Sequence, residues 1–373
     1  MTVPKKNRWK NFKAVCFGIF LGLLLCEIIL RIYNPFPFAL KRGKLVLPSN
    51  IKTEYNNKWI SKLDQVIYFS KNSLGFRGAE PNGDIDKINS IIVVGGSTTE
   101  CRFISDSLTW PAQLGAELSD SIPNLWLNNA GLDGHSTFGH LLLTKDYLVK
   151  LKPRFVIFLT GINDVETERP ELFDLMNENK INFRSFKSFI KSVANKTETG
   201  STIMNFLAIK KAWKKGLIHK EVNFTKLGDT VLTQTYIDSM LKKQDVFLAG
   251  YKARIDSLIK LCRQNNMEPI WITQPSLYGD YTDPDTKLNM KNKRVPGSSP
   301  ITNYELAEKI LEKYNDVVRS FGTEIKVVDL AKQMPKQTSL YYDNIHFTNK
   351  GAETVGKIIA VELSSYLKNK FNE

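Results

Sequence analysis

Five short runs of apolar residues, rich in valine and isoleucine, constrain the fold of this chain more than any other feature. They lie at residues 91–95, 125–130, 155–160, 269–273 and 325–329. The run IIVV is apolar at every position, which is typical of a strand covered on both faces of a parallel sheet. Helical stretches are expected between and after these runs, at about 109–119, 138–150, 236–266, 302–321 and 349–368. The alternation predicts an α/β fold with helices on both faces of a central parallel sheet.

The 373 residues are 42% hydrophobic, which is ample for a packed core. We expect the main domain to occupy residues 89–373, and the proline-containing stretch before it, 34–88, to form a stalk and N-terminal extension. Residues 166–235 are too many for a simple loop. We interpret them as a helical insertion that could form a lid beside a site.

An apolar segment near the start, AVCFGIFLGLLLCEIIL, extends to about residue 33 and is long enough to span a bilayer. We predict a transmembrane anchor at 14–33, with Glu27 and Arg31 four positions apart on one helix face. The alternative is a cleaved signal peptide, but no A-x-A-like site follows. Residues 1–13 are basic with no acidic residue, which predicts a cytoplasmic tail and an extracytoplasmic, periplasmic or extracellular, main domain.

The net charge of +14 does not by itself indicate a nucleic-acid partner, since no zinc-finger spacing, RNP-like strand or basic zipper is present. The excess is concentrated in 176–226, where FLAIKKAWKKGLI resembles a basic amphipathic helix. This surface either lies against anionic lipid or an acidic polymer, or is simply solvated. Cys101 and Cys262 are the only exported pair that could form a disulfide, and the sequence does not decide whether they do. No metal-site spacing or cofactor motif is present, and the oligomeric state is not predicted.

Polar residues follow the predicted strands directly, at the edge of the sheet where open α/β folds bind ligands. Ser97 follows the first strand in GGSTT, Gly131 and Gly134 follow the second in NNAGLDGHST, and Asn163 follows the third in GIND. Asp343 and His346 follow the last strand in YYDNIHFTNKG. Each group alone has a plain structural explanation, as a turn or a solvated loop before a helix cap. Together they are the parts that an acyl-transfer site requires.

A serine hydroxyl needs a base to become a nucleophile, and an imidazole is suited to this near neutral pH. We therefore expect His346 to be the base for Ser97, and Asp343 to accept the other ring N–H. The oxyanion requires preorganised donors, which the Ser97 N–H, a glycine N–H and the Asn163 amide could supply.

These four blocks resemble the SGNH (GDSL-type) hydrolases, over about residues 90–351. The resemblance implies a flavodoxin-like three-layer fold, with Ser97 as nucleophile, Gly134 and Asn163 in the oxyanion hole, and Asp343 and His346 in D-x-x-H. One position departs from the usual G-D-S-L pattern, because Gly96 stands where that pattern has Asp; this resembles a branch written G-G-S-T. The family also includes membrane-anchored members that remove acyl groups from glycans, and relatives that transfer them.

The leading hypothesis is a membrane-anchored serine esterase that acts on short acyl esters, such as acetyl groups on a small molecule or on cell-envelope glycans. An O-acyltransferase acting on polysaccharide, a lysophospholipase or thioesterase, and a non-catalytic glycan-binding module are the alternatives. His135, Gln274 and Tyr278 are candidate substrate contacts, although a surface position for His135 and turn packing for the other two are the default expectations. His140 and His219 are interpreted as incidental.

Overall fold

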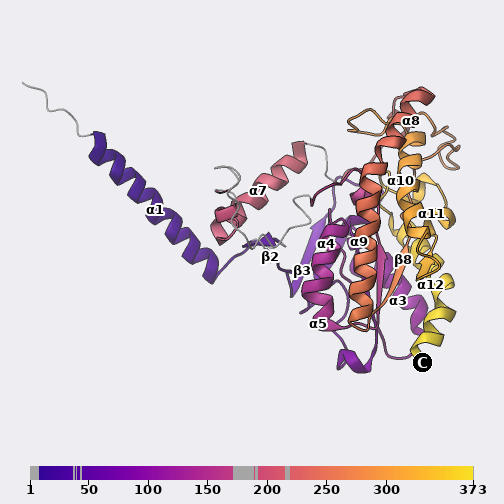
Figure 1. Cartoon of the computed structure of the whole chain (residues 1–373), viewed down its shortest axis with the longest axis horizontal. Coiled ribbons are helices and arrows are strands. Elements are labelled where there is room, and N and C mark those ends of the chain that lie inside the picture. The colour runs from indigo at the N-terminus through magenta and orange to yellow at the C-terminus, as the bar shows by residue number, and fades with distance from the viewer. Residues whose placement is uncertain are drawn as a thin grey trace, which may run out of the picture. The chain divides into compact units, whose positions relative to one another are not determined.

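The computed structural model describes residues 8–36, 38, 40–42, 44–170, 189, 192–214 and 219–372. The chain divides into two compact units (Figure 1). The N-terminal unit falls within residues 1–48 and 175–215, and the main unit comprises 49–174 and 216–373. Each unit is described by itself.

The main unit is built on a sheet of five parallel strands among the described residues. They are β5 (Asn89–Gly95), β6 (Leu125–Asn129), β7 (Phe155–Leu159), β8 (Glu268–Ile272) and β9 (Lys326–Val328), in the order β6-β5-β7-β8-β9. This is the 2-1-3-4-5 order of flavodoxin-like folds, whose ligands bind where the strand order reverses. All five residues of β7 are buried, because helices cover both faces of the sheet. The predicted fold class is confirmed.

Helices pack in two groups on this sheet. In one, α3 (Trp110–Ser119) packs against α12 (Asn349–Asn372) and β6. In the other, α9 (Asp245–Gln264) packs against α4 (Thr137–Leu143), α10 (Tyr304–Arg319) and β8, as Figure 1 shows for α4 and α9. The other described α-helices of the main unit are α2 (Ser97–Glu100), α5 (Val149–Leu151), α8 (Gln234–Lys243) and α11 (Leu330–Gln333).

Two of the expected helices are interrupted. The helix expected at 236–266 is broken at Gln244, between α8 and α9. The buried side-chain amide of Gln244 donates to Glu166 and to the carbonyl of Met240, which fixes the break. The helix expected at 138–150 contains a π-helical turn, Thr144–Leu148, between α4 and α5.

An antiparallel hairpin that the sequence analysis did not anticipate precedes the sheet. It consists of β3 (Ile51–Asn56) and β4 (Val66–Lys71), within the stretch interpreted as stalk and extension. Ile67 and Phe69 of β4 are buried, whereas β3 is mostly exposed. Because only one strand buries its side chains, the hydrophobic pattern of the pair is weak. Cys101 and Cys262 are both free and buried, so they do not form a disulfide.

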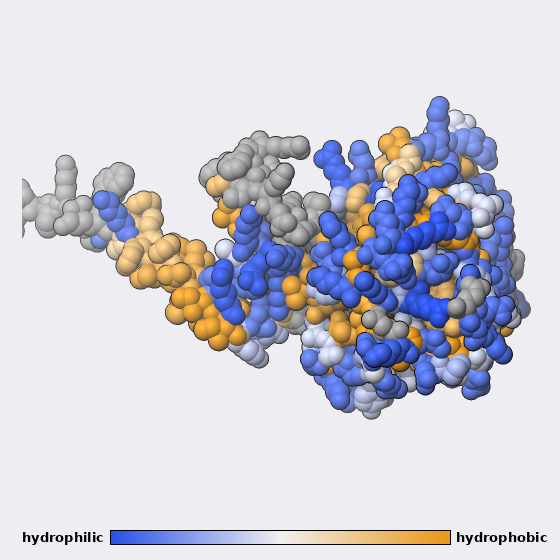
Figure 2. All heavy atoms as spheres, turned by 60° about the horizontal axis from the view of Figure 1, so that its bottom comes forward, coloured by the Kyte–Doolittle hydropathy of each residue, from blue (hydrophilic) through white to orange (hydrophobic). Residues whose placement is uncertain are grey.

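The N-terminal unit contains α1 (Arg8–Ile32), the short strands β1 (Leu40–Lys41) and β2 (Lys44–Leu45), and α7 (Glu198–Lys214). The stretch Asn11–Ile32 of α1 is long and apolar enough to cross a membrane, although a signal sequence would have the same properties. Figure 2 shows α1 as a nearly continuous apolar surface. The predicted insertion includes α7; residues 171–188, 190–191 and 215–218 of it lie outside the described residues.

Candidate active site

The carboxyl edge of the sheet gathers the predicted site residues. Ser97 is the first residue of α2 and comes two residues after the end of β5. Gly134 lies in the turn between β6 and α4, and Asn163 in the 3-10 turn Ile162–Asp164 after β7. Asp343 and His346 lie in the loop between the 3-10 turn Thr338–Leu340 and α12.

Three of these side chains form a continuous hydrogen-bonded chain. The Oγ of Ser97 lies 2.8 Å from Nε2 of His346, and Nδ1 of the same ring lies 2.7 Å from Oδ2 of Asp343. An ionised carboxylate only accepts hydrogen bonds, so Nδ1 carries the proton and donates to Asp343. Nε2 is then left to accept the Ser97 hydroxyl proton, which is the arrangement that general-base catalysis requires.

The loop that carries Asp343 and His346 is held by its own backbone. The N–H of Tyr342 donates to the carbonyl of His346, and Tyr341 pairs with Phe347 in an antiparallel bridge. Oδ1 of Asp343 accepts the N–H groups of Ile345 and His346 at 2.9 and 2.8 Å.

This hydrogen bonding also keeps Asp343 charged. Burial alone would raise the pKa of its carboxyl, but the charge of the His346 imidazole and these hydrogen bonds outweigh the effect and hold the pKa below its usual range. Asp343 therefore stays ionised beside His346 and can orient its ring.

The residues around Ser97 form a cluster of hydrogen-bond donors. The side-chain amide of Asn163 donates to the carbonyl of His135 at 2.9 Å and lies so close to Gly96 that a Cβ at this position would be 2.3 Å from its nitrogen. Gly134 has φ +74°, a conformation that favours glycine. Within the described part of the chain, the N–H groups of Ser97 and Gly134 make no hydrogen bond. Both N–H groups are thus available as donors beside Ser97 Oγ.

A buried ion pair ties the two turns of this cluster together. Asp164, next to Asn163, accepts hydrogen bonds from the N–H and hydroxyl of Thr137, at the start of α4. Arg254 of α9 donates to Thr137 Oγ1 at 2.7 Å and lies 3.4 Å from Asp164. Because α4 begins just after the turn of Gly134, this link fixes the Asn163 amide relative to that turn.

His219 is a residue of the site that the sequence analysis missed. Its ring centroid lies 4.3 Å from that of His346. Its Nδ1 lies 2.6 Å from the hydroxyl of Tyr342, and its Nε2 3.3 Å from the carboxylate of Asp133. No local motif in the sequence marks His219, since it follows no strand and lies within the predicted insertion. His219 was interpreted as incidental, but it lies directly beside His346.

The pair of Asp133 and His219 favours its charged form. For His219, burial lowers the pKa, but the hydrogen bond and charge of Asp133 outweigh burial and the pKa is raised overall. For Asp133, whose side chain is partly exposed, the hydrogen bond and charge of His219 lower the pKa to about 2. An additional charged pair thus lies beside the imidazole of His346.

His135 and His140 are both buried, so the default expectation of a surface position for His135 is wrong. His135 directly follows Gly134, whose left-handed φ of +74° turns the chain at this point. Burial lowers the pKa of His135 to about 4 and that of His140 to about 3, so both are neutral at physiological pH.

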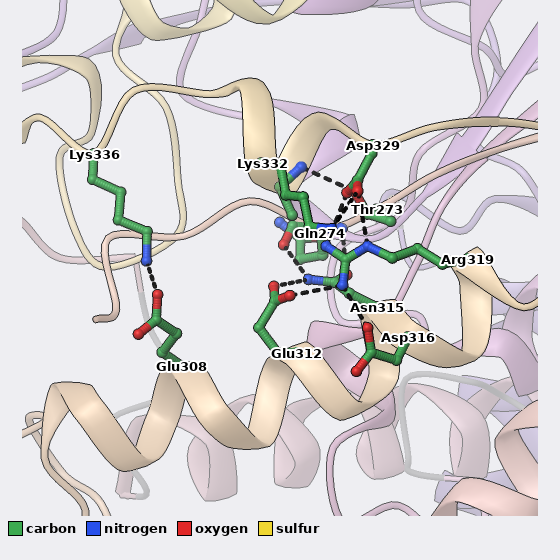
Figure 3. A network of polar contacts seen from close by, with 11 residues as sticks. Thr273, Gln274, Glu308, Glu312, Asn315, Asp316, Arg319, Asp329, Lys332 and Lys336 are labelled. Atoms are coloured by element: carbon green, nitrogen blue, oxygen red, sulfur yellow. Dashed lines mark hydrogen bonds and ion pairs between the residues drawn. The ribbon is translucent and has the colours of Figure 1, made fainter. Parts of the chain in front are cut away.

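Gln274 is buried next to Thr98, the neighbour of Ser97, and has almost no exposed surface with which to contact a substrate. Its side-chain oxygen accepts the hydroxyl of Thr98 at 3.3 Å. Its backbone exchanges hydrogen bonds with the amide of Asn315 in α10. Figure 3 shows this contact beside the ion pairs of Arg319. Its pair with Asp329 holds α10 to the end of β9, whereas its pairs with Glu312 and Asp316 lie within α10.

Tyr278, in contrast, is partly exposed and lines a pocket of about 240 Å³. Ile162 and Val165, on either side of Asn163 and Asp164, line the same pocket together with Ile310 and Leu311 of α10. The pocket is thus adjacent to the turn that carries Asn163, and its wall is mainly apolar.

The chain is similar to known proteins in sequence and in structure. Residues 93–354 match the GDSL-like Lipase/Acylhydrolase family. Among solved structures, the chain is similar to the lipase/acylhydrolase from Enterococcus faecalis (16% identity, TM-score 0.40) and to an acetylxylan esterase from Geobacillus stearothermophilus (14% identity, TM-score 0.39). Each similarity covers 74% of this chain and 96% of the other. No curated protein matches the sequence.

Proposed function

Because the chain belongs to the GDSL-like lipase/acylhydrolase family, a family of ester-bond hydrolases, we propose that it is a serine esterase, anchored to a membrane by α1, that cleaves short acyl esters. The observation that carries the proposal is the hydrogen-bonded chain from Ser97 through His346 to Asp343, with distances of 2.8 and 2.7 Å. A non-catalytic binding module would not require a nucleophile, a base and a buried carboxylate in this order.

The reaction begins when Oγ of Ser97 attacks the ester carbonyl and its proton passes to Nε2 of His346. The new C–O bond places negative charge on the former carbonyl oxygen. The N–H groups of Ser97 and Gly134 and the amide of Asn163 are the donors for this oxyanion. Asp343 stabilises the imidazolium through Nδ1–H.

The tetrahedral intermediate collapses when the ester C–O bond breaks and His346 returns its proton to the leaving alcohol. The acyl group is then bound covalently to Ser97. Water, activated by His346 in the same way, attacks the acyl-enzyme and releases the acid. An acceptor hydroxyl in place of this water would give acyl transfer, so the two reactions differ only in what reaches the acyl-enzyme.

A row of aromatic rings supports a carbohydrate as the alcohol part of the substrate. Trp59 is 52% exposed and lies 6.1 Å from Phe103, which in turn lies 5.1 Å from the ring of His219, centroid to centroid. His219 is next to His346. Aromatic faces are large, rigid binding surfaces, and sugar rings stack on them through their C–H groups. This row leads from the surface toward the proposed base.

The full chain in detergent, assayed with p-nitrophenyl acetate, tests the activity. We expect Ser97→Ala and His346→Ala each to lower kcat by about 10⁴-fold or more, since the members of such a triad act as one unit. Ser257→Ala, which removes an exposed hydroxyl on α9, is the matched control and should retain full activity. Equal rates in all four proteins would exclude the esterase.

A substrate screen then distinguishes the substrate classes. Acetylated oligosaccharides, lysolipids and acyl thioesters are offered with and without sugar acceptors. Release of acetate from the oligosaccharides supports the proposal, acyl transfer to an added sugar identifies an acyltransferase, and preference for lysolipids or thioesters identifies a lysophospholipase or a thioesterase.

A further inference from the structure

In the N-terminal unit, the acidic residue of the apolar helix α1 caps the start of a second helix, α7. Glu27 lies within the apolar stretch of α1, and its carboxylate accepts the N–H groups of Glu198 and Thr199 at 3.1 and 2.9 Å. These two residues begin α7. The first N–H groups of a helix have no partner within it, and a carboxylate at this position both satisfies them and complements the helix dipole.

Further contacts hold α7 to the segment that follows α1. The carboxylate of Glu198 accepts the amide of Asn34 at 3.0 Å and pairs with Arg42 at 3.0 Å. The backbone N–H of Arg42 donates to the hydroxyl of Ser201. The ring of Phe206 packs edge-on against Phe36 and Phe38, each at 5.2 Å. The start of α7 is thus attached to the end of α1 by several independent contacts.

These contacts fix the level along the axis of α1 at which α7 begins, and therefore its depth in a bilayer that α1 crosses. A helix rises about 1.5 Å per residue, so Glu27 lies roughly 7 Å along the axis from the last residue of α1, Ile32. Interfacial helices bury their apolar face about 5–10 Å into the boundary between headgroups and acyl chains. Figure 1 shows α7 turned across the direction of α1. If α1 crosses a bilayer, α7 therefore starts at this boundary and runs along it.

The exposed face of α7 suits such a location. Ile203, Phe206 and Leu207 are about half exposed, at 51%, 48% and 54%, and their spacing places them on one face. Contiguous exposed apolar side chains on a helix mark an interaction surface. Lys210 continues this row one turn later, and Lys211 and Lys214 follow in the sequence of α7. The only acidic residue of α7, Glu198, is already paired.

We propose that α7 is an interfacial helix, with Ile203, Phe206 and Leu207 among the acyl chains and Lys210 near anionic lipid headgroups, on the side of the bilayer where α1 ends. The inference rests on the proposed membrane anchoring by α1. It explains two features of the sequence together: the acidic residue inside the apolar segment, and the basic, partly apolar helix in the insertion. The occupant of the exposed face is a lipid surface that carries negative charge.

Site-specific fluorescence on the full chain tests the proposal. In a Cys16→Ser, Cys26→Ser background the remaining cysteines, Cys101 and Cys262, are buried, so an added surface cysteine can be labelled with the environment-sensitive dye NBD. Leu207→Cys places the label on the proposed lipid face. Val361→Cys, at a residue of α12 that is 82% exposed, provides the matched control in the main unit.

The labelled proteins are reconstituted into vesicles of phosphatidylcholine with about 30% phosphatidylglycerol. We expect the label at position 207 to be quenched by shallow doxyl lipids about threefold more strongly than the label at 361, and by aqueous iodide less strongly. Lys210→Ser, Lys211→Ser and Lys214→Ser combined should remove the part of this quenching that depends on phosphatidylglycerol. Glu27→Ala should weaken lipid quenching at 207, because it removes the cap of α7.

The results that overturn the proposal are distinct from failure of the proposed anchor or activity. If the chain floats with vesicles but the label at 207 is quenched by iodide as strongly as that at 361, α7 is not interfacial although α1 is an anchor. Equal lipid quenching at both positions also overturns it. Self-quenching at 207 that rises with protein density would assign the face to a second copy of the chain. A chain that does not float removes the anchor, while p-nitrophenyl acetate hydrolysis by the same samples reports on the esterase separately.

Discussion

The ring of His219 lies 4.3 Å from the ring of His346, centroid to centroid, and two hydrogen bonds hold it there. One partner is Asp133, which directly precedes Gly134, and the other is Tyr342, which directly precedes Asp343. His219 thus connects the turn of Gly134, a proposed oxyanion donor, with the loop of His346, the proposed base.

We expect His219→Phe, which keeps a ring but removes both hydrogen bonds, to lower kcat for p-nitrophenyl acetate about 10- to 100-fold, because small displacements of reacting groups cost this much. KM should change little, since His219 positions other groups. His219→Gln retains a donor and an acceptor and should give an intermediate kcat. Wild-type kcat in both variants would show that the contact between the two rings has no role in catalysis.

The same pair predicts a pH dependence of stability. Asp133 raises the pKa of His219 in the folded protein, despite burial. Its charged form therefore stabilises the folded state below the unfolded pKa of about 6.5, and the stabilisation is lost as the pH rises through the folded value. The difference in unfolding free energy between wild type and His219→Phe should be largest between about pH 4 and pH 6.5, and it should fall as the pH rises above this window. Chemical denaturation across this range measures it, and a difference that grows with pH would contradict the assignment.

Gly96 stands where the usual family pattern has Asp, and the structure gives a reason for glycine. A Cβ at this position would lie 2.3 Å from the amide nitrogen of Asn163. We expect Gly96→Ala to displace that amide and to lower kcat at least about 100-fold, as loss of one oxyanion donor does.

The matched control for this variant is Gly115→Ala. Gly115 lies in α3, and a Cβ there would meet the side chain of Leu127 at an ordinary 3.5 Å. Activity should be retained, and the unfolding free energy should rise by about 0.5–1 kcal/mol, because alanine is favoured over glycine inside a helix. Full activity of Gly96→Ala would show that the Asn163 amide tolerates displacement.

The meeting of Ser97 and Asn163 could be predicted because each directly follows a predicted strand, and parallel strands end at one edge of a sheet. Asp343 and His346 come after α11 and the 3-10 turn Thr338–Leu340, so their assignment to the site came from residue type and order. Ser97 and His346 are 249 positions apart, yet their side chains form a hydrogen bond. The sequence therefore predicts which residue types meet at the site and in which order they occur, but not the contacts of the loops that carry them.

His219 could not be predicted in the same way, because only tertiary packing brings its segment to the site. The inward direction of His135 depends on the left-handed conformation of Gly134, which residue type allows but does not dictate. The hairpin of β3 and β4 was missed for a similar reason: β3 is mostly exposed, so its apolar alternation is weak.

The buried pair of Asp164 and Arg254 predicts an effect on both stability and rate. Asp164→Ala leaves the guanidinium of Arg254 buried without its carboxylate partner, which should lower the unfolding free energy by about 3–5 kcal/mol. Because Asp164 also fixes Asn163 relative to α4, kcat should fall as well. Asp164→Asn retains an acceptor for Thr137 and should lose less of both. Thermal unfolding and p-nitrophenyl acetate kinetics measure the two effects, and unchanged values in Asp164→Ala would contradict the positioning role.

The aromatic row predicts a change in substrate affinity without a change in chemistry. Trp59 is half exposed and connects through Phe103 and His219 to His346, so a sugar ring stacked on it would contribute binding energy far from the reacting bond. If stacking is worth about 0.5–1.5 kcal/mol, Trp59→Ala should raise KM for an acetylated oligosaccharide about two- to twelvefold. Its kcat should be unchanged, and the kinetics of methyl acetate, which has no ring to stack, should not respond.

Two further variants make this prediction specific to the row. Trp59→Phe keeps an aromatic face and should restore most of the affinity. Tyr68→Ala removes an aromatic side chain of β4 that is 60% exposed but has no ring contact to the row among the described residues, and it should leave KM unchanged. A KM for the oligosaccharide that is the same in wild type and Trp59→Ala would mean that the alcohol part of the substrate does not lie on this surface. The carbohydrate preference would then have to come from another wall of the site, such as the pocket beside Ile162 and Tyr278.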